Sequence, residues 1–171
     1  YAEQPGREWR SVEDTTHDPI FGARKPKPNA SWARGEDYYN EGSLTWLAVD
    51  MTIRELSKGR RSLDDFAKAF FGVRDGDWGV LTYDFDEVVA TLNKVQPYDW
   101  ASFLKERIHE AGAPAPLTGI EKGGYKLVWK EEPNAFDKEQ MKEGGSVNLI
   151  HSLGLTLDKE GKVTQVIWNK P

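Results

Sequence analysis

The sequence predicts an α+β fold, with a mainly helical part over about residues 1–110, a linker over residues 111–116 and a small antiparallel β region over residues 117–171. Three observations lead to this prediction. Apolar residues recur at helical spacing between residues 39 and 108. The linker consists of small residues and two prolines, which is typical of a connection between folded parts. Beyond it, apolar and polar residues alternate with the period of a half-buried strand.

The first 37 residues contain four prolines and show neither helical nor strand periodicity. We expect an extended segment that wraps the helical part and packs its large apolar side chains on it. A loop that lines a cleft is the alternative. The side chains concerned are Trp9, Ile20, Phe21 and Trp32.

A polar cluster lies inside this segment, at Asp14, His17 and Asp18, with Arg24 nearby. Aspartate and histidine can bind metals, but adjacent residues of an extended chain point to opposite sides, so His17 and Asp18 are poorly placed to share an ion. We favour a turn stabilised by Asp18 before Pro19 over a metal site. A contribution of this cluster to a substrate cleft is the further alternative.

The strongest helical pattern runs from about residue 39 to residue 57 and carries apolar residues on two faces. We therefore expect a central helix that is packed on most of its circumference. Asp50 and Arg54 are one turn apart and are predicted to form an ion pair. Gly59 is predicted to end the helix in the left-handed conformation. The apolar residues are Leu44, Leu47, Ala48 and Met51 on one face and Trp46, Val49, Ile53 and Leu56 on the other.

Three further helices are predicted from their capping residues. Ser62 with Asp65, and Asp84 with Glu87, have the spacing of a capping box, in which the two side chains accept hydrogen bonds from backbone N–H groups of the first turn. Asp99 is predicted to cap the last of these helices. Behind each cap, apolar residues recur at helical spacing.

In the β region, residues 125–129 alternate between apolar and other side chains and predict a strand. Residues 135–143 predict one or two exposed helical turns. Further strands are predicted over residues 147–157 and 162–168, joined by a turn that contains Gly161. About fifty residues cannot easily close a sheet without exposed edges. We therefore expect the chain, which also lacks an initiator methionine, to be a piece of a longer protein.

The composition is that of a folded domain, with 38% hydrophobic and 12% aromatic residues. The net charge of −5 offers no general attraction to phosphate, so we predict no nucleic-acid partner. The absence of cysteine excludes disulfides, thiolate zinc sites and cysteine nucleophiles. No apolar run approaches the roughly 20 residues of a membrane span, so we predict no span.

Several runs of residues resemble the glycyl aminopeptidase family, zinc metallopeptidases that combine a thermolysin-like catalytic domain with a C-terminal PDZ domain. The most specific run is YYNEGSL at residues 38–44, followed by GRRSLDD at 59–65. The resemblance continues through YDFDEVV at 83–89 and QPYDW at 96–100. Residues 152–155, SLGL, resemble the lead into the PDZ domain. The chain thus resembles the C-terminal part of the catalytic domain with the start of the PDZ region.

The resemblance implies a parent enzyme that removes N-terminal glycine or alanine from peptides, with zinc held by a His-Glu-x-x-His motif and a glutamate on the next helix. That motif does not occur in the 171 residues, and His17, His109 and His151 are too scattered to replace it. The resemblance therefore places zinc in an N-terminal catalytic segment of the parent. We expect this fragment to bind no metal or other cofactor and to be inactive alone. The implied location is the bacterial periplasm or another exported one.

One catalytic role falls within the sequence. In related peptidases a tyrosine three residues before a glycine donates its hydroxyl to the oxyanion opposite the zinc, and Tyr39 stands three residues before Gly42. The resemblance therefore implies that Tyr39 stabilises the oxyanion, with Tyr38 as the second choice. The alternative is that Tyr39 only packs at the start of the helix.

A non-catalytic peptide-binding or scaffold module is the competing interpretation. PDZ domains bind a peptide terminus by strand addition and backbone donors. Residues 152–155 would form the carboxylate-binding loop of such a domain. The partner helix and the remaining strands would follow Pro171, so we expect weak binding by this region alone.

Overall fold

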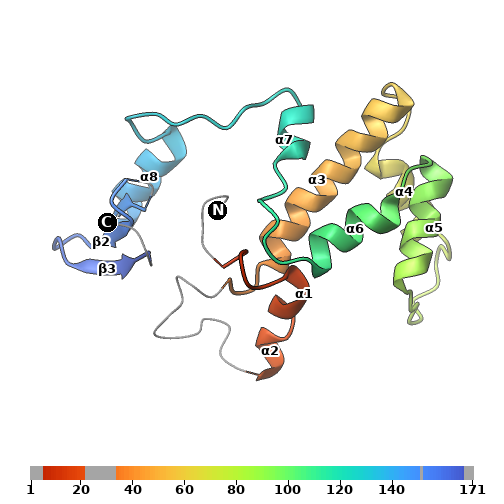
Figure 1. The fold of residues 1–171 in the computed structure, drawn as a ribbon, viewed down its shortest axis with the longest axis horizontal. Helices are drawn as coiled ribbons and strands as arrows, with labels where there is room; N and C mark the ends of the chain where they lie inside the picture. The colour runs from red at the N-terminus through yellow and green to blue at the C-terminus, as the bar shows by residue number, and fades with distance from the viewer. Residues whose placement is uncertain (1–5, 22–33, 151, 168–171) are drawn as a thin grey trace.

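The computed structural model describes residues 6–21, 34–150 and 152–167, apart from the side chain of Phe21. It confirms the α+β class, with a helical part followed by a small antiparallel sheet (Figure 1). The elements are α1 (Val12–Thr15), α2 (Asp18–Phe21), α3 (Tyr38–Ser57), α4 (Leu63–Phe71), α5 (Phe85–Val95), α6 (Trp100–His109), α7 (Thr118–Lys122), α8 (Ala135–Gly144), β1 (Val147–Leu149), β2 (Leu155–Leu157) and β3 (Val163–Val166).

The hydrophobic core lies where α3 meets α4, α5 and α6. Trp100 is fully buried there, and its indole Nε1 donates a 2.8 Å hydrogen bond to the carbonyl oxygen of Gln96. This bond satisfies the polar atom of the ring, so the largest core side chain is buried without a lost hydrogen bond. The buried members of the core are Val49, Ile53, Phe66, Leu92, Val95, Trp100 and Leu104.

The C-terminal end of α3 forms as predicted. Gly59 has a φ of 76°, and Lys58 before it is also left-handed, with a φ of 56°. The predicted ion pair is present, with 2.8 Å between Arg54 Nε and Asp50 Oδ2. The other carboxylate oxygen of Asp50 accepts a 2.7 Å hydrogen bond from the backbone N–H of Leu63. Asp50 therefore also joins α3 to the start of α4.

Most of α3 is packed, as 13 of its 20 residues are buried or half-buried, but two of the apolar residues expected to pack are exceptions. Leu47 and Leu56 are 37% and 44% exposed, whereas Thr45 and Thr52 are buried. One side of α3 faces the core and another faces the short helix α7 (Figure 1), and the side chains of Leu47 and Leu56 are covered completely by neither.

The contact between α7 and α3 is close. A Cβ added at Gly119 would lie 2.6 Å from the backbone nitrogen of Ala48, so only glycine permits this approach. Lys122 Nζ donates a 3.2 Å hydrogen bond to Thr52 Oγ1, 70 residues away, and lies 2.7 Å from Glu55 Oε2. Sequence periodicity does not predict α7, because five residues are too few to display it.

Side-chain caps begin the next three helices as predicted. Ser62 and Asp65 form a capping box at the start of α4, and Asp84 and Glu87 form one at the start of α5. Asp99 caps α6 through its side chain. Each cap satisfies backbone donors that a helix leaves unpaired at its start, which explains why these boundaries were readable from single residues.

The N-terminal segment differs from the prediction. It is not extended over the described residues 6–21, because these contain the two short helices α1 and α2. Trp9 and Ile20 are 59% and 75% exposed, so they do not pack on the helical part. Trp32 and the side chain of Phe21 lie outside the description. Among the described residues, Arg7 and Arg34 join this segment to α3 through ion pairs.

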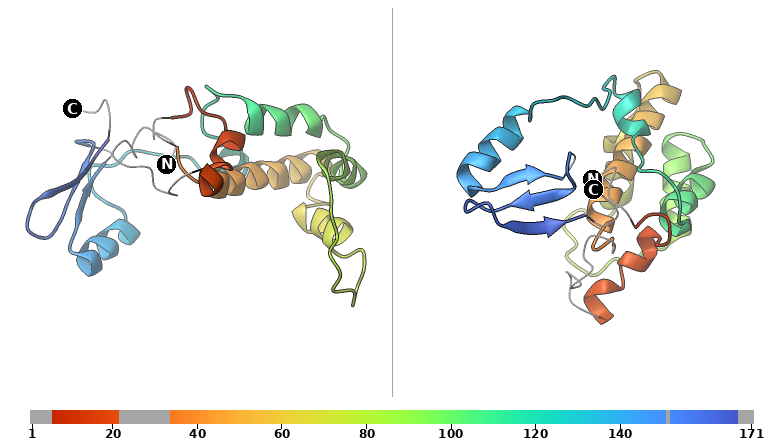
Figure 2. Two further views of the ribbon diagram at one scale, coloured as in Figure 1. Left: turned by 90° about the horizontal axis from the view of Figure 1, so that it is seen from below. Right: turned by 60° about the vertical axis from the view of Figure 1, so that its left-hand side comes forward.

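The sheet is antiparallel in the order β1-β2-β3 and lies with α8 apart from the helical part (Figure 2). Asn148 pairs with Thr156, and Thr156 pairs with Gln165. The single strand predicted over residues 147–157 is wrong, because a turn divides it into β1 and β2. The predicted turn before β3 is present, and Gly161 there has a φ of 79°.

The strand predicted over residues 125–129 is absent, and these residues belong to an extended connection between α7 and α8 (Figure 1). Leu127 and Trp129 are 58% and 61% exposed. Alternation of apolar and polar residues predicts a surface suited to a sheet, but a strand also needs a partner to bond with. The helical turns predicted over residues 135–143 are confirmed by α8.

Candidate functional site

The two candidate tyrosines open α3. Tyr39 is 65% exposed, while Tyr38 is half-buried, and their ring centroids are 4.7 Å apart. The backbone N–H of Tyr39 donates a 3.2 Å hydrogen bond to the carbonyl oxygen of Glu36. Tyr39 therefore stands on the first turn of the central helix with most of its side chain in solvent.

A buried ion-pair network lies behind this first turn. Glu41 Oε2 accepts hydrogen bonds from Arg7 Nη2 at 2.9 Å and from Arg34 Nη2 at 3.0 Å. Arg34 also pairs through Nε with the carboxylate of Asp37. The four side chains are only 4–8% exposed. Two guanidinium groups and two carboxylates balance in charge, which is the condition for burying them.

Arg10 extends the network to α1 and α2. Its guanidinium pairs with the carboxylates of Asp14 and Asp18, and Arg34 Nη1 donates a 2.9 Å hydrogen bond to the Arg10 carbonyl oxygen. Burial disfavours the charge of Arg10, but the hydrogen bonds to Asp18 and Asp14 outweigh burial and raise the pKa of the guanidinium. The turn predicted at Asp18 before Pro19 is replaced by the first residues of α2.

Of the other members of the predicted polar cluster, His17 is exposed, and Arg24 lies outside the described residues. No group of three or more histidine, aspartate or glutamate side chains that could hold a metal ion occurs within the part of the chain that the structure describes. His109 Nδ1 lies 2.7 Å from Glu13 Oε2 and joins α6 to α1. His151 lies outside the description.

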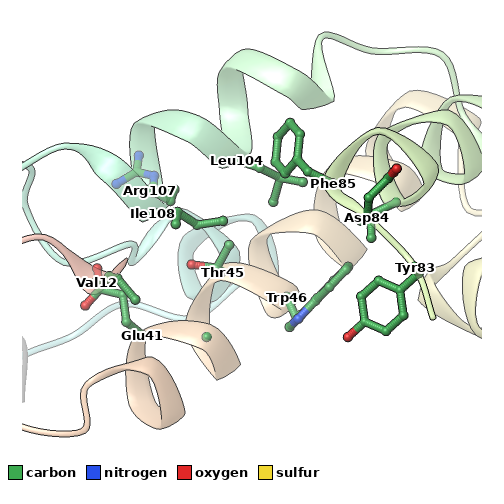
Figure 3. Close-up of a pocket in the computed structure, with 12 residues that line it drawn as sticks. Val12, Glu41, Thr45, Trp46, Tyr83, Asp84, Phe85, Leu104, Arg107 and Ile108 are labelled. Carbon is green, nitrogen blue, oxygen red and sulfur yellow. The ribbon is translucent and has the colours of Figure 1, made fainter. Parts of the chain in front are cut away.

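An apolar pocket of about 310 Å³ opens beside this network, between α1, α3, α5 and α6. Figure 3 shows Val12 and Glu41 at one end and Tyr83 and Asp84 at the other. Tyr39 does not line it. These four helices and the two residues before α5 form its walls, and the remaining lining residues are Gly42, Thr45, Trp46, Phe85, Val88, Leu104, Arg107 and Ile108.

Sequence reasoning identified Tyr39 but neither the network nor the pocket. Arg7 and Glu41 are 34 residues apart, and no local pattern connects them. The available signal was weak: Arg7, Arg34, Asp37 and Glu41 are charges of both signs around the start of an otherwise apolar helix. The pocket could not be read from the sequence because its walls meet only in the folded helical part.

In the candidate carboxylate-binding loop of the β region, residues 152–155, three backbone N–H groups form hydrogen bonds within the loop itself. The carbonyl oxygen of Leu149 accepts hydrogen bonds from the backbone N–H groups of Ser152, Leu153 and Gly154, at 3.2, 2.8 and 3.0 Å. These are the donors that a peptide carboxylate would need. Because these donors are already bonded in the turn between β1 and β2, they are not available to a peptide carboxylate.

No protein-family model matches this chain, and no curated protein matches it. Among the described residues, no helix is both long enough and apolar enough to cross a membrane.

Proposed function

We propose that this chain is part of a zinc-dependent aminopeptidase that removes N-terminal glycine or alanine from peptides, and that Tyr39 stabilises the oxyanion of the reaction. The proposal begins from the resemblance at residues 38–44. The observation that supports it is the placement of Tyr39, 65% exposed on the first turn of a helix whose opposite side is held by buried ion pairs.

A phenol in this position performs one chemical task. When water attacks a peptide carbonyl, negative charge develops on the carbonyl oxygen, and a donor already in place lowers the energy of that state. The Tyr39 hydroxyl donates such a hydrogen bond and keeps its proton. Because buried ion pairs hold the first turn of the helix, the backbone that carries the hydroxyl is already ordered, which lowers the cost of placing it.

The residues that the structure describes do not fit a zinc site. The His-Glu-x-x-His motif is absent from the sequence, and the described residues contain no suitable cluster of ligands. We therefore assign zinc to the N-terminal catalytic segment of the parent, which would be the main partner of this chain besides the peptide substrate. We derive no step through the metal. The same proposal includes export from a bacterial cytoplasm.

The competing interpretation, a PDZ-like peptide-binding module, receives less support. Its carboxylate loop would need free backbone donors, and those of Ser152, Leu153 and Gly154 are bonded to Leu149. The three short strands contain only 3, 3 and 4 residues. Among the described residues, this sheet is too small to carry a stable peptide-binding groove.

The test is an aminopeptidase assay with a glycyl-leaving-group substrate, on this chain and on a chain extended N-terminally by the segment that carries the zinc motif. We expect zinc-dependent, chelator-sensitive turnover only in the longer chain. Tyr39→Phe should lower kcat about 10²–10³-fold, the usual effect of removing one oxyanion donor.

Tyr125→Phe is the matched control, because Tyr125 is similarly exposed, at 75%, but lies far along the chain from α3. Full activity of the Tyr39→Phe enzyme would overturn the role of Tyr39. Zinc-dependent turnover by the short chain would show that the reacting groups lie elsewhere, and inactivity of both chains would favour the binding module.

A further inference from the structure

We propose that Glu41 is a positioning residue for Tyr39. Its carboxylate holds Arg7 and Arg34 under the first turn of α3, and this contact sets where the helix begins and where Tyr39 points. The value of that orientation for catalysis rests on the proposed function. The effect on the helix start does not.

The first feature that supports the inference is the missing cap. Asp37 occupies the N-cap position of α3 but makes no capping hydrogen bond with its side chain, and its backbone is already in the helical region. Its carboxylate is taken by Arg34 instead. α4 and α5, in contrast, begin with complete capping boxes. The start of α3 therefore depends on ion pairs where its neighbours depend on caps.

The second feature is the arrangement around the helix. Tyr39 and Glu41 are two positions apart, so their side chains leave the helix about 200° apart. Glu41 is 4% exposed, and Tyr39 is 65% exposed. The buried carboxylate thus holds one side of the first turn while the tyrosine extends from the other. A rotation or unwinding of this turn would move both side chains together.

The third feature is the charge balance of the cluster. Glu41 is the carboxylate that both Arg7 and Arg34 contact, and Asp37 contacts Arg34. Changing Glu41 to a neutral residue leaves two buried guanidinium groups facing one carboxylate. Such an imbalance favours exposure of a charge to water, and the shortest way to expose it is to open the first turn of α3.

The primary experiment compares Glu41→Gln with Glu55→Gln in this chain. Glu55 is on the same helix and pairs with Lys122, but its side chain is 60% exposed. Amide hydrogen exchange is measured by NMR for the first turn, residues 41–43, and for the helix middle, residues 49–53. Tyrosine ring signals are recorded in parallel, since the adjacent Tyr38 and Tyr39 rings shift one another's resonances.

We expect Glu41→Gln to accelerate exchange in the first turn about tenfold or more relative to the helix middle and to move the Tyr39 ring signals. Glu55→Gln should do neither. Uniform acceleration along α3 with unchanged Tyr39 signals would overturn the proposal, because it would show a general loss of stability without a local effect.

A second variant covers the case in which Glu41→Gln does not fold. The double variant Arg7→Met with Glu41→Gln removes one charge of each sign and keeps Arg34 paired with Asp37, so no buried charge is left without a partner. It should fold and still show fast exchange in the first turn, because the ion pairs of Glu41 with Arg7 and Arg34, which hold this turn, are lost even when the buried charges balance. Normal exchange there would mean that Arg34 and Asp37 alone set the helix start, which overturns the role of Glu41.

The catalytic consequence is measured in the longer, active chain. Glu41→Gln should lower kcat with little change in KM, and it should cause no further loss when Tyr39 is already phenylalanine. An equal loss in both backgrounds would overturn the link to Tyr39. If the unmodified longer chain is inactive, the proposed function fails, and the exchange experiment still decides whether Glu41 sets the start of α3.

Discussion

Gly119→Ala should separate α7 from α3. The added methyl group would lie 2.6 Å from the backbone nitrogen of Ala48 and 2.8 Å from the carbonyl carbon of Leu47. Both atoms belong to the backbone of a 20-residue helix and cannot turn aside as a flexible side chain would. The clash can be relieved only if α7 moves away, which also strains the contact of Lys122 with Thr52.

The size of the effect follows from this geometry. Forcing one methyl group into a closely packed contact typically costs about 1–3 kcal/mol. The slightly better helix propensity of alanine offsets this by about 0.5–1 kcal/mol at most. Gly42→Ala is the matched control, because its added Cβ has no neighbour within 4 Å. We expect that substitution to stabilise α3 by about 0.5–1 kcal/mol, which is the opposite sign.

Urea unfolding followed by circular dichroism measures both variants. The midpoint should fall for Gly119→Ala and rise for Gly42→Ala. A stability within about 0.5 kcal/mol of the unmodified chain for Gly119→Ala would refute the argument. It would mean that α7 contributes nothing to the stability of the folded state, or that the backbone of α3 moves to accommodate the added methyl group.

Three further predictions concern the helical part. Leu92→Ala should lower the free energy of unfolding by about 2–5 kcal/mol, since Leu92 is fully buried in the core, and urea unfolding checks this. Asp84→Ala should cost about 1 kcal/mol in the same assay by removing half of the capping box with Glu87. The backbone N–H of Ser102 lowers the pKa of Asp99 below its ordinary value of 3.8, so this carboxylate stabilises the fold above that pH and loses the contribution as the pH falls through its folded pKa. The stability of the unmodified chain should therefore fall more between about pH 6 and pH 3 than that of Asp99→Asn, and equal losses would contradict the assignment.

The helical part was predictable where single residues act locally. A cap such as Asp84 needs only its own backbone and a residue three positions later, so the sequence contains the whole interaction. The strand expected at residues 125–129 failed for the converse reason. Its alternation is real, but pairing depends on another strand, and none lies beside it among the described residues.

The candidate site was likewise predictable only in its local features. The position of Tyr39 at the start of α3 followed from the helical pattern and the resemblance, and its role stays a prediction. Nothing in the local sequence distinguishes Glu41 from other acidic residues near a helix start, yet it is 4% exposed and pairs with two arginines. Arg7 reaches it from a separate segment, and contacts of that range depend on the fold as a whole.

Contacts between distant parts of the chain also affect the order in which it can fold. Lys122 meets Thr52 across 70 residues, and His109 meets Glu13 across 96. Closing such long loops has a high entropic cost, whereas α4 and α5 follow α3 directly and can dock early. During synthesis, α3 must therefore wait with one side bare until α7 has left the ribosome. In that interval the side of α3 around Ala48, which is only 1% exposed in the folded chain, is available to the wrong partners, so a chain truncated before residue 118 should aggregate rather than remain a soluble intermediate.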